Sequence, residues 1–335
     1  MNRVERALGL TLPLLQAGMG GVAGPALCAA VSRAGAGGVL GLYKEPPERV
    51  HALVTAAAEL TDRPFGINII PEVAGHALAL AQARAAIAAL PSRGFATFFG
   101  LPDAETARTV TDAGRALVVQ VGTEPAAARA LLLGAGAVVL QGVEAGGHHL
   151  GTSPVAALLA EVRAWHPDAV LVAAGGIATG SDLARVLAAG ADGAMAGTLF
   201  VPAAESDAHP LFKRRVVASR ASDTVVTGLF DIGWPGRPHR VLRNSLTARR
   251  SRLEPHFIAR TTAGGRELPV ARYSAAVPSA RTSGRIEEMA MYCGCSCERV
   301  TCAHPVASLL TRFRQEYARA ARRGSLAKDR EWTTS

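Results

Sequence analysis

The sequence predicts an α/β protein, a (β/α)8 TIM barrel with a smaller C-terminal excursion on its substrate side. Eight short apolar runs occur within the first 206 of the 335 residues. Longer Ala-rich stretches separate these runs, with apolar residues at i, i+3 and i+4, as in amphipathic helices. The runs are continuously apolar, which is typical of parallel strands covered on both faces. Eight such units in about 200 residues favour a closed barrel.

A doubly wound sheet is the alternative fold. The turn after the first apolar run, residues 18–24, contains four glycines and weakly resembles a dinucleotide-binding loop. That loop type is accompanied by an acidic residue at the end of the second strand. Here the second run ends in Leu40-Gly41-Leu42. The barrel is therefore favoured.

Each expected element follows from one run or stretch. The expected strands are residues 12–17, 37–42, 64–69, 95–99, 116–121, 135–140, 169–174 and 192–196. The expected helices between them are residues 26–34, 47–60, 77–90, 125–133, 155–165 and 182–189. Aromatic residues make up only 5% and glycine numbers 35, so small side chains allow helices to pack closely on the strands.

The chain divides into three regions by composition. Residues 1–206 form the predicted barrel. Residues 207–290, rich in Arg, Pro, Gly, Ser and Thr, are expected to be an irregular cover on the substrate side. Residues 291–335 are expected to return to the barrel, with helical patterns over 289–300 and 306–323 and a polar tail from Gly324.

Charge and cysteine content exclude several classes of protein. Residues 1–206 carry a net charge of −3 and residues 207–335 one of +12. The basic half lacks interleaved aromatic residues and any nucleic-acid motif, so we expect no nucleic-acid partner. No apolar run reaches the ~18 residues of a membrane span, so no membrane partner is expected. Five cysteines, an odd number, favour a reducing compartment, and we expect a cytoplasmic protein.

The last two runs of the barrel are followed by small residues that suit a phosphate. Active sites of such barrels lie at the carboxyl ends of the strands, and phosphate often binds after strands seven and eight. The seventh run ends in Ala174-Gly175-Gly176, and the eighth in Ala196-Gly197-Thr198. Glycine lets the backbone approach an anion closely. We therefore expect a phosphate between these loops.

The sixth run leads into a glycine pair and two histidines. It reads from Gln141 through Glu144 and Gly146-Gly147 to His148 and His149. Glycine weakens strands, so the pair makes sense where a flat ligand lies against the backbone. His148 is expected to project over that ligand and His149 to be structural. Glu144 has no obvious carboxylate partner, so we expect a structural hydrogen bond rather than a general acid.

Together these motifs resemble the nitronate monooxygenases, formerly called 2-nitropropane dioxygenases, which are FMN-dependent (β/α)8 enzymes. The resemblance covers roughly residues 10–245, and its most specific element is Glu144 to His148. The related flavin enoyl-reductases of fatty acid synthesis and NADH:quinone reductases share much of the pattern. The matching stretches are residues 16–19, 65–68, 119–121, 141–148, 174–177 and 197–198.

The resemblance implies a role for each matching residue. His148 corresponds to the catalytic base, which removes the α-proton of a neutral nitroalkane. FMN then takes electrons from the nitronate, and O2 completes the oxidation. The residues that the resemblance places around FMN are Ala17, Gly18 and Met19 along the ring, Asn68, Gln120 and Gln141 as hydrogen-bond partners, Gly146 and Gly147 near the ring, and Ala174, Gly175, Gly176, Ala196, Gly197 and Thr198 at the phosphate.

Two positions depart from the family pattern. Gly18 stands where the family usually has Pro, and Cys295 stands where a Gln near the flavin is expected. The second departure lies in a cluster made of Cys293, Cys295, Cys297 and Cys302. Their spacing fits neither zinc fingers nor ferredoxins. A metal, a redox-active thiol and inert packing beside the flavin remain open.

Three functions remain open. The first is oxidation of nitronates or nitroalkanes with O2. The second is an FMN-dependent reductase that takes a hydride from NAD(P)H and passes it to a quinone or an enoyl thioester. The third is a flavin-binding protein without catalysis, which the presence of His148 disfavours. Whether NAD(P)H is a substrate and whether the chain forms a homodimer also remain open.

Overall fold

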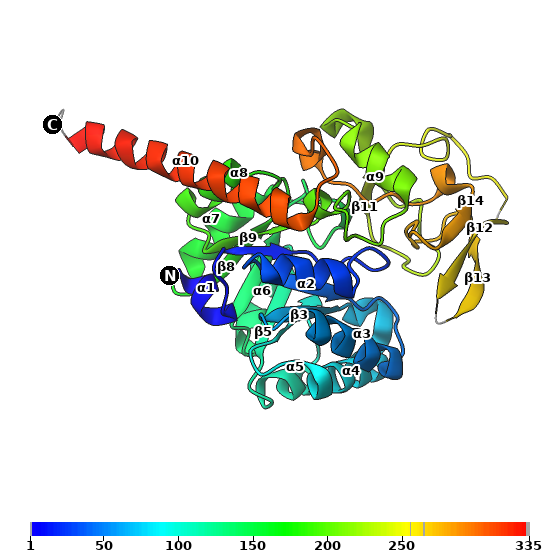
Figure 1. The fold of residues 1–335 in the computed structure, drawn as a ribbon, viewed down its shortest axis with the longest axis horizontal. Coiled ribbons are helices and arrows are strands. Elements are labelled where there is room, and N and C mark those ends of the chain that lie inside the picture. Colours follow the sequence, from blue (N-terminus) through cyan, green and yellow to red (C-terminus); the bar gives the residue numbers. More distant parts are fainter. Residues whose placement is uncertain (1, 255, 264, 333–335) are drawn as a thin grey trace.

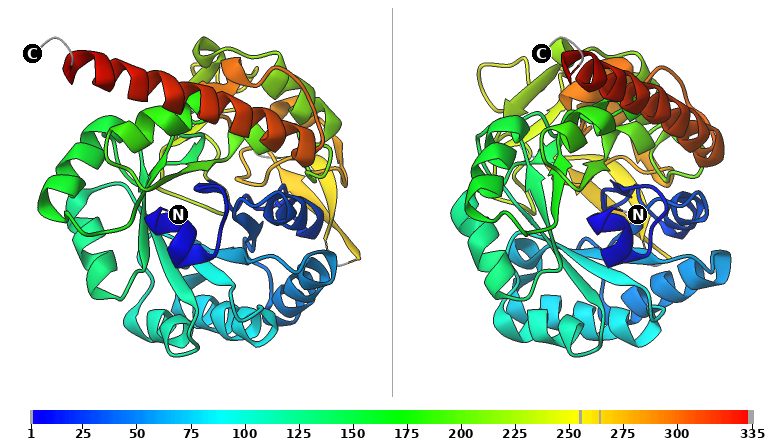
Figure 2. Two further views of the ribbon diagram at one scale, coloured as in Figure 1. Left: turned by 60° about the vertical axis from the view of Figure 1, so that its left-hand side comes forward. Right: turned by 90° about the vertical axis from the view of Figure 1, so that its left-hand side faces the viewer.

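The computed structural model describes residues 2–332 apart from residues 255 and 264. Eight parallel strands form one sheet that curls into a barrel (Figure 2). They are β1 (Leu14–Gln16), β2 (Gly38–Gly41), β3 (Phe65–Ile69), β4 (Phe95–Phe99), β5 (Ala116–Val121), β6 (Ala137–Gln141), β8 (Leu171–Ala174) and β9 (Gly193–Ala196). Their order is β1-β9-β8-β6-β5-β4-β3-β2, and a parallel bridge between Leu15 and Gly37 joins the two ends. The predicted barrel is confirmed.

Helices surround the barrel, as Figure 2 shows. They are α2 (Pro25–Arg33), α3 (Pro47–Leu60), α4 (Pro71–Ala89), α5 (Ala104–Thr111), α6 (Glu124–Leu132), α7 (Val155–Trp165) and α8 (Gly180–Ala188). Helix α5 was not among the expected helices, and its sequence is short and largely polar, with Ala107 and Val110 buried. Its start is set locally, since the Asp103 side chain accepts hydrogen bonds from the backbone of Glu105 and Thr106.

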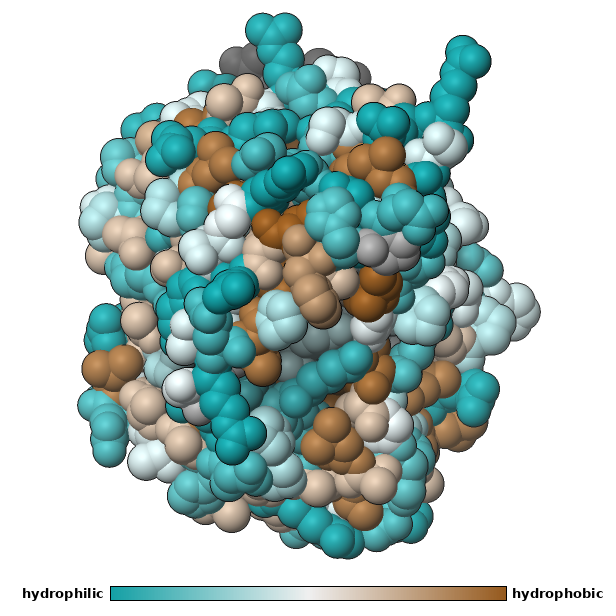
Figure 3. All heavy atoms as spheres, turned by 90° about the vertical axis from the view of Figure 1, so that its right-hand side faces the viewer, coloured by the Kyte–Doolittle hydropathy of each residue, from teal (hydrophilic) through white to brown (hydrophobic). Residues whose placement is uncertain are grey.

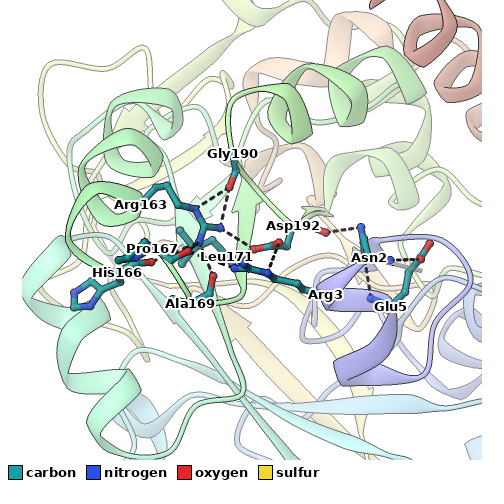
Figure 4. A network of polar contacts seen from close by, with 10 residues as sticks. All are labelled: Asn2, Arg3, Glu5, Arg163, His166, Pro167, Ala169, Leu171, Gly190 and Asp192. Carbon is teal, nitrogen blue, oxygen red and sulfur yellow. Dashed lines mark hydrogen bonds and ion pairs between the residues drawn. The ribbon is translucent and has the colours of Figure 1, made fainter. Parts of the chain in front are cut away.

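A short helix that was not expected closes the amino end of the barrel. In α1 (Arg3–Leu8), Val4 and Leu8 join the apolar side chains inside the barrel. Figure 4 shows the polar contacts at this end. Arg163 donates to the Gly190 and Ala169 carbonyls and forms an ion pair of 2.7 Å with Asp192. These contacts tie the loops at the closed end together.

The region expected to be an irregular cover contains regular elements. It carries α9 (Pro210–Val217), β10 (Thr224–Thr227), β11 (His239–Leu242), β12 (Phe257–Ala263), β13 (Arg266–Ala271) and β14 (Thr282–Gly284). One small sheet has the order β10-β11-β7, where β7 (Gly147–His148) belongs to the loop after β6. The other has the order β13-β12-β14 and lies at the far side from the N-terminus (Figure 1). The strands β12 and β13 form a hairpin, whereas the pairing of β11 with β7 is long-range and is not revealed by local sequence patterns.

The helix expected over residues 289–300 is wrong. The chain there is largely extended, and Tyr292 is bridged to Val241 of β11. A short 3-10 helix, η4 (Cys295–Arg299), follows. The Leu242 N–H donates a hydrogen bond to the Met291 carbonyl, and the Cys293 N–H donates one to the Arg240 carbonyl. These bonds to β11 replace the hydrogen bonds of a helix. Tertiary pairing has overridden the local helical signal.

The last helix, α10 (Val306–Trp332), packs along α8 and then projects beyond the barrel (Figure 1). It continues through Gly324, where a polar tail was expected. Its inner face contributes Val306, Leu310 and Phe313 to the main core. Within the described residues, no helix is both long enough and apolar enough to cross a membrane.

Candidate active site

A cavity of about 360 Å³ lies at the carboxyl ends of the barrel strands, beneath the two small sheets. Figure 3 looks onto the face that carries β12–β14, where apolar side chains gather around a hollow with polar ones about it. The cavity is lined by every site residue expected from the sequence: Ala17, Gly18, Met19, Asn68, Gln120, Gln141, Gly146, Gly147, His148, Ala174, Gly175, Gly176, Ala196, Gly197 and Thr198. The fold thus brings distant motifs into one site.

His148 is held in place by its backbone. It lies on β7 opposite His239 of β11 in an antiparallel pair. The Gln141 side chain donates to the His148 carbonyl at 2.9 Å and accepts from the Leu150 N–H at 2.8 Å. Gln141 was expected to bond the flavin. In the structure its amide supports the turn that presents His148, and the residue lines the cavity.

The His148 ring lies in an aromatic enclosure. The Trp234 indole stacks on it, with ring centroids 3.7 Å apart and planes inclined by 14°. The His239 and Tyr292 rings lie at 4.9 Å and 5.2 Å. His148 Nε2 is buried and has no hydrogen-bond partner among the described residues. Burial, assisted by His239, His149 and Arg237, lowers the pKa of His148 to about 3. The imidazole is therefore neutral in the free protein.

The neighbouring histidines are fixed by hydrogen bonds. His239 Nε2 accepts from the Phe230 N–H at 3.2 Å, and its Nδ1 lies 2.9 Å from the Arg237 carbonyl. These partners assign a neutral His239 with its proton on Nδ1. His149 Nε2 lies 2.9 Å from the Ala145 carbonyl, so this side chain pins the loop. Burial lowers the pKa of both histidines.

Glu144 holds the same loop to a helix. Its carboxylate accepts from the Val155 N–H, at the start of α7, at 3.1 Å. A carboxylate at a helix N-terminus is favoured by the helix dipole. This contact is the structural hydrogen bond expected from the sequence.

The small residues after β8 and β9 line the cavity with backbone. Gly175 and Gly176 have φ of 113° and 71°, a region that favours glycine. The Thr198 hydroxyl accepts a hydrogen bond of 2.9 Å from the Gly294 N–H, which leaves its proton available to a ligand. The arrangement suits an anion approached by backbone and hydroxyl groups.

Two amides and one glycine shape the opposite wall. The Asn68 carboxamide oxygen lies 2.8 Å from the Thr97 hydroxyl. The Asn68 NH2 and the Gln120 amide line the cavity and hydrogen-bond no described residue. A Cβ at Gly18 would collide with the Asn68 side chain. Gly18, at the position where proline was expected, therefore lets Asn68 occupy its place.

The C-terminal third contributes residues that sequence analysis missed. Trp234, Tyr292, Gly294, Ser296 and Arg281 line the cavity. A Cβ at Gly146 would lie about 2.6 Å from the Cys293 carbonyl carbon, so the two backbones touch. Trp234 lies among glycines and prolines within the region that was expected only to be an irregular cover.

The cysteine cluster splits in two. Cys293 and Cys297 are buried, and the Cys293 thiol donates to the Gly294 carbonyl at 3.7 Å. Cys295 and Cys302 are partly exposed. Cys295, which stands where the family has a Gln near the flavin, does not line the cavity. Across the residues that the structure describes, no three His, Cys, Asp or Glu side chains are placed to hold a metal ion.

The sequence model of the family described as nitronate monooxygenase matches residues 2–316. The chain belongs to this family. Nitronate monooxygenases are FMN-dependent oxidoreductases, as the resemblance implied. The match to the family thus covers the barrel, both small sheets and the start of α10.

Among curated relatives, the chain is 34% identical over 247 residues to the (3aS,4S,5R,7aS)-5-hydroxy-7a-methyl-1-oxo-octahydro-1H-indene-4-carboxyl-CoA dehydrogenase of Mycobacterium tuberculosis, covering 71% of this chain and 65% of the relative. The match thus spans slightly less than two thirds of that protein. The nitronate monooxygenase of Pseudomonas aeruginosa is 32% identical over 292 residues, covering 73% and 80% of the two chains.

Among solved structures, the nitroalkane oxidase of Streptomyces ansochromogenes has a TM-score of 0.72 and 28% identity, over 95% of this chain and 99% of that one. The whole architecture, and not the barrel alone, is therefore shared.

The site fits FMN on three observations. The cavity is in the size range of cofactor sites. The backbone at Gly175 and Gly176 and the Thr198 hydroxyl offer groups for a phosphate. The unpartnered Asn68 NH2 and Gln120 amide offer hydrogen bonds to a polar heterocycle or a ribityl chain.

Proposed function

We propose that this protein oxidises alkyl nitronates or nitroalkanes with molecular oxygen, using FMN, with His148 as the base. The observation that carries the proposal is the His148 imidazole. It is buried and neutral, and its Nε2 has no partner among the described residues. A buried imidazole nitrogen without a hydrogen-bond partner is costly unless a bound ligand supplies one. The family of the chain supports the same activity.

We propose the following placement of FMN. Ala17, Gly18, Met19, Gly146 and Gly147 contact the ring. Asn68 and Gln120 hydrogen-bond it or the ribityl chain, and Gln141 acts through His148. The phosphate is held by Ala174, Gly175, Gly176, Ala196, Gly197 and Thr198. When bound, FMN supplies the electron acceptor of the reaction.

The residues of the chain perform the proton transfer. His148 accepts the α-proton of a neutral nitroalkane at an imidazole nitrogen, which generates the nitronate. The carbonyl contact to Gln141 and the β7–β11 pairing fix the backbone of His148. Trp234 and Tyr292 exclude water from the ring, so the imidazole stays neutral until the proton arrives.

The second candidate is an FMN-dependent NAD(P)H reductase that acts on a quinone or an enoyl thioester. The observation that favours it is the 34% identity to a dehydrogenase whose name specifies a CoA thioester. The net charge of +12 over residues 207–335 would suit anionic phosphates of such a substrate or of NAD(P)H.

Anaerobic mixing tests the two candidates. The yellow protein is mixed with NADH or NADPH, and separately with a nitronate, while flavin absorbance is followed. Bleaching by the nitronate alone supports the proposal. Bleaching by the nicotinamide alone overturns it in favour of the reductase. A cytoplasmic location and a homodimer remain predictions.

A further inference from the structure

We propose that Trp234 is a specificity-determining residue of this site: its indole covers the His148 ring and limits which substrates reach it. The shielding of His148 is independent of the reaction. Only the choice of alkyl nitronates as probes rests on the proposed function.

The contact between the two rings is close and enclosed. The indole and the imidazole are stacked at 3.7 Å, and their exposed fractions are 6% and 5%. Phe99 and Trp234 pack edge to face with ring centroids 5.4 Å apart, and the Tyr43 ring is stacked with the indole at a centroid distance of 6.1 Å. Trp234 thus fills the space that a bulky substrate would need beside His148.

Trp234 belongs to a turn that joins β10 to β11, residues 228–238, which we call the tryptophan turn. Polar side chains of the barrel bind the tryptophan turn. Glu72, in the first turn of α4, pairs with Arg237 at 2.7 Å and lies 3.4 Å from the Trp234 indole nitrogen. The Glu72 and Arg237 side chains, which link the turn to the barrel, are both partly exposed.

A second anchor holds the middle of the tryptophan turn. The Gly233 carbonyl accepts from Lys44 Nζ at 2.8 Å and from the Tyr43 hydroxyl at 3.1 Å. Lys44 has φ of 54°, a left-handed conformation that is costly for a residue with a side chain. Gly233 has φ of 94°. The left-handed backbone of Lys44 is strained, and such strain persists where the surrounding contacts hold it, often at functional sites.

Three consequences follow for access to the site. A small nitronate can lie in the cavity with Trp234 in place. A long or branched one meets the indole, because His148 and Trp234 line the same cavity. Removing the indole should therefore expose His148 and widen the range of substrates.

The first test measures shielding directly and needs no turnover. FMN-loaded protein is treated with diethyl pyrocarbonate, and carbethoxylation of His148 is followed by peptide mass spectrometry. The rate of modification depends on access to the imidazole. Trp234→Ala should therefore raise the rate at His148 about tenfold or more. Trp234→Phe, which keeps an aromatic ring, should restore much of the shielding. Glu72→Gln should raise the rate only a few-fold, because partly exposed ion pairs are weak.

The matched control is Trp165→Ala, since Trp165 is 73% exposed on α7, away from the cavity. Its rate should equal that of the wild type. An unchanged rate in Trp234→Ala would overturn the proposal. So would an equal rise in Trp165→Ala, which would indicate general loosening.

The second test measures selectivity. The ratio of kcat/KM for a hexyl nitronate to that for an ethyl nitronate should rise about tenfold or more in Trp234→Ala, as expected when a pocket wall is removed. An unchanged ratio would contradict a role in specificity. If the wild type oxidises no nitronate, the proposed function fails, whereas the modification rates still decide whether Trp234 shields His148.

Discussion

The side-chain amide of Gln141 donates a hydrogen bond to the backbone carbonyl of His148, 2.9 Å away. Its oxygen also accepts from the Leu150 N–H, so one side chain spans the turn on both sides of the histidine. Gln141 ends β6 and is itself buried. The last residue of a rigid strand therefore sets the position of the proposed base.

Replacing Gln141 should misplace His148. In Gln141→Glu the carboxylate cannot donate to the His148 carbonyl, so the turn should shift. A small displacement of a catalytic group can cost about 10²-fold in rate. We expect kcat for a neutral nitroalkane to fall by about that factor, with a much smaller change in KM. Steady-state kinetics would show it, and retention of FMN would exclude general unfolding. An unchanged kcat would mean that β7–β11 pairing alone holds His148.

His148→Asn should separate the two forms of the substrate. Loss of a general base typically costs 10²–10⁴-fold, so turnover of a neutral nitroalkane should fall by about that much. A pre-formed nitronate has already lost its proton and should be largely spared. The measurement is kcat/KM for each form before they interconvert. The matched control is His149→Asn, which should be much milder. Equal losses on both forms would instead assign His148 to substrate positioning.

Stability should depend on pH through the buried histidines. The pKa of His148 is lowered to about 3, and the pKa values of His149 and His239 are lowered as well. Below pH ~6.5 the unfolded chain binds protons that the folded protein does not, which favours unfolding. For His148 the free energy of unfolding should fall between pH ~6.5 and ~3, by up to about 1.4 kcal/mol per pH unit, and the lowered pKa values of His149 and His239 add to the fall below pH ~6.5.

Urea unfolding between pH 7.5 and 5 checks this dependence. The slope should be smaller in His148→Asn, because one titrating group is gone. A stability that is flat over this range, or that rises on acidification, would contradict the neutral state of these side chains.

A carboxylate at Gly197 should expel FMN. A Cβ at this position would lie 3.5 Å from the Ala17 Cβ and 3.6 Å from the Met19 sulfur, which are ordinary contacts, so a Cβ is tolerated there. Gly197→Asp adds a negative charge beside the proposed phosphate, whereas Gly197→Asn adds a similar shape without charge. We expect Gly197→Asp to bind FMN at least about tenfold more weakly than Gly197→Asn, from charge repulsion. Flavin fluorescence titration measures both. Equal affinities would place the phosphate elsewhere.

The sequence by itself determined the barrel and the inner wall of its site. Each buried strand is a short apolar run, and this signal is local because both faces of the sheet are covered. The glycines at 146, 147, 175, 176 and 197 were also recognisable, since backbone that approaches a ligand excludes larger side chains. Their position at strand ends, with the family resemblance, was enough to predict the phosphate loops and His148.

The tertiary structure alone decided the outer wall and the environment of the base. Trp234, His239 and Tyr292 come from a region without clear periodicity. They reach His148 because β11 pairs with β7 across about ninety residues of chain. A separate bridge between Tyr292 and Val241 of β11 holds the first part of the expected helix at 289–300 as extended backbone, ahead of the short 3-10 helix η4. The low pKa of His148 arises from desolvation by these side chains. Desolvation depends on which distant groups pack together, and the residues adjacent in sequence do not encode that.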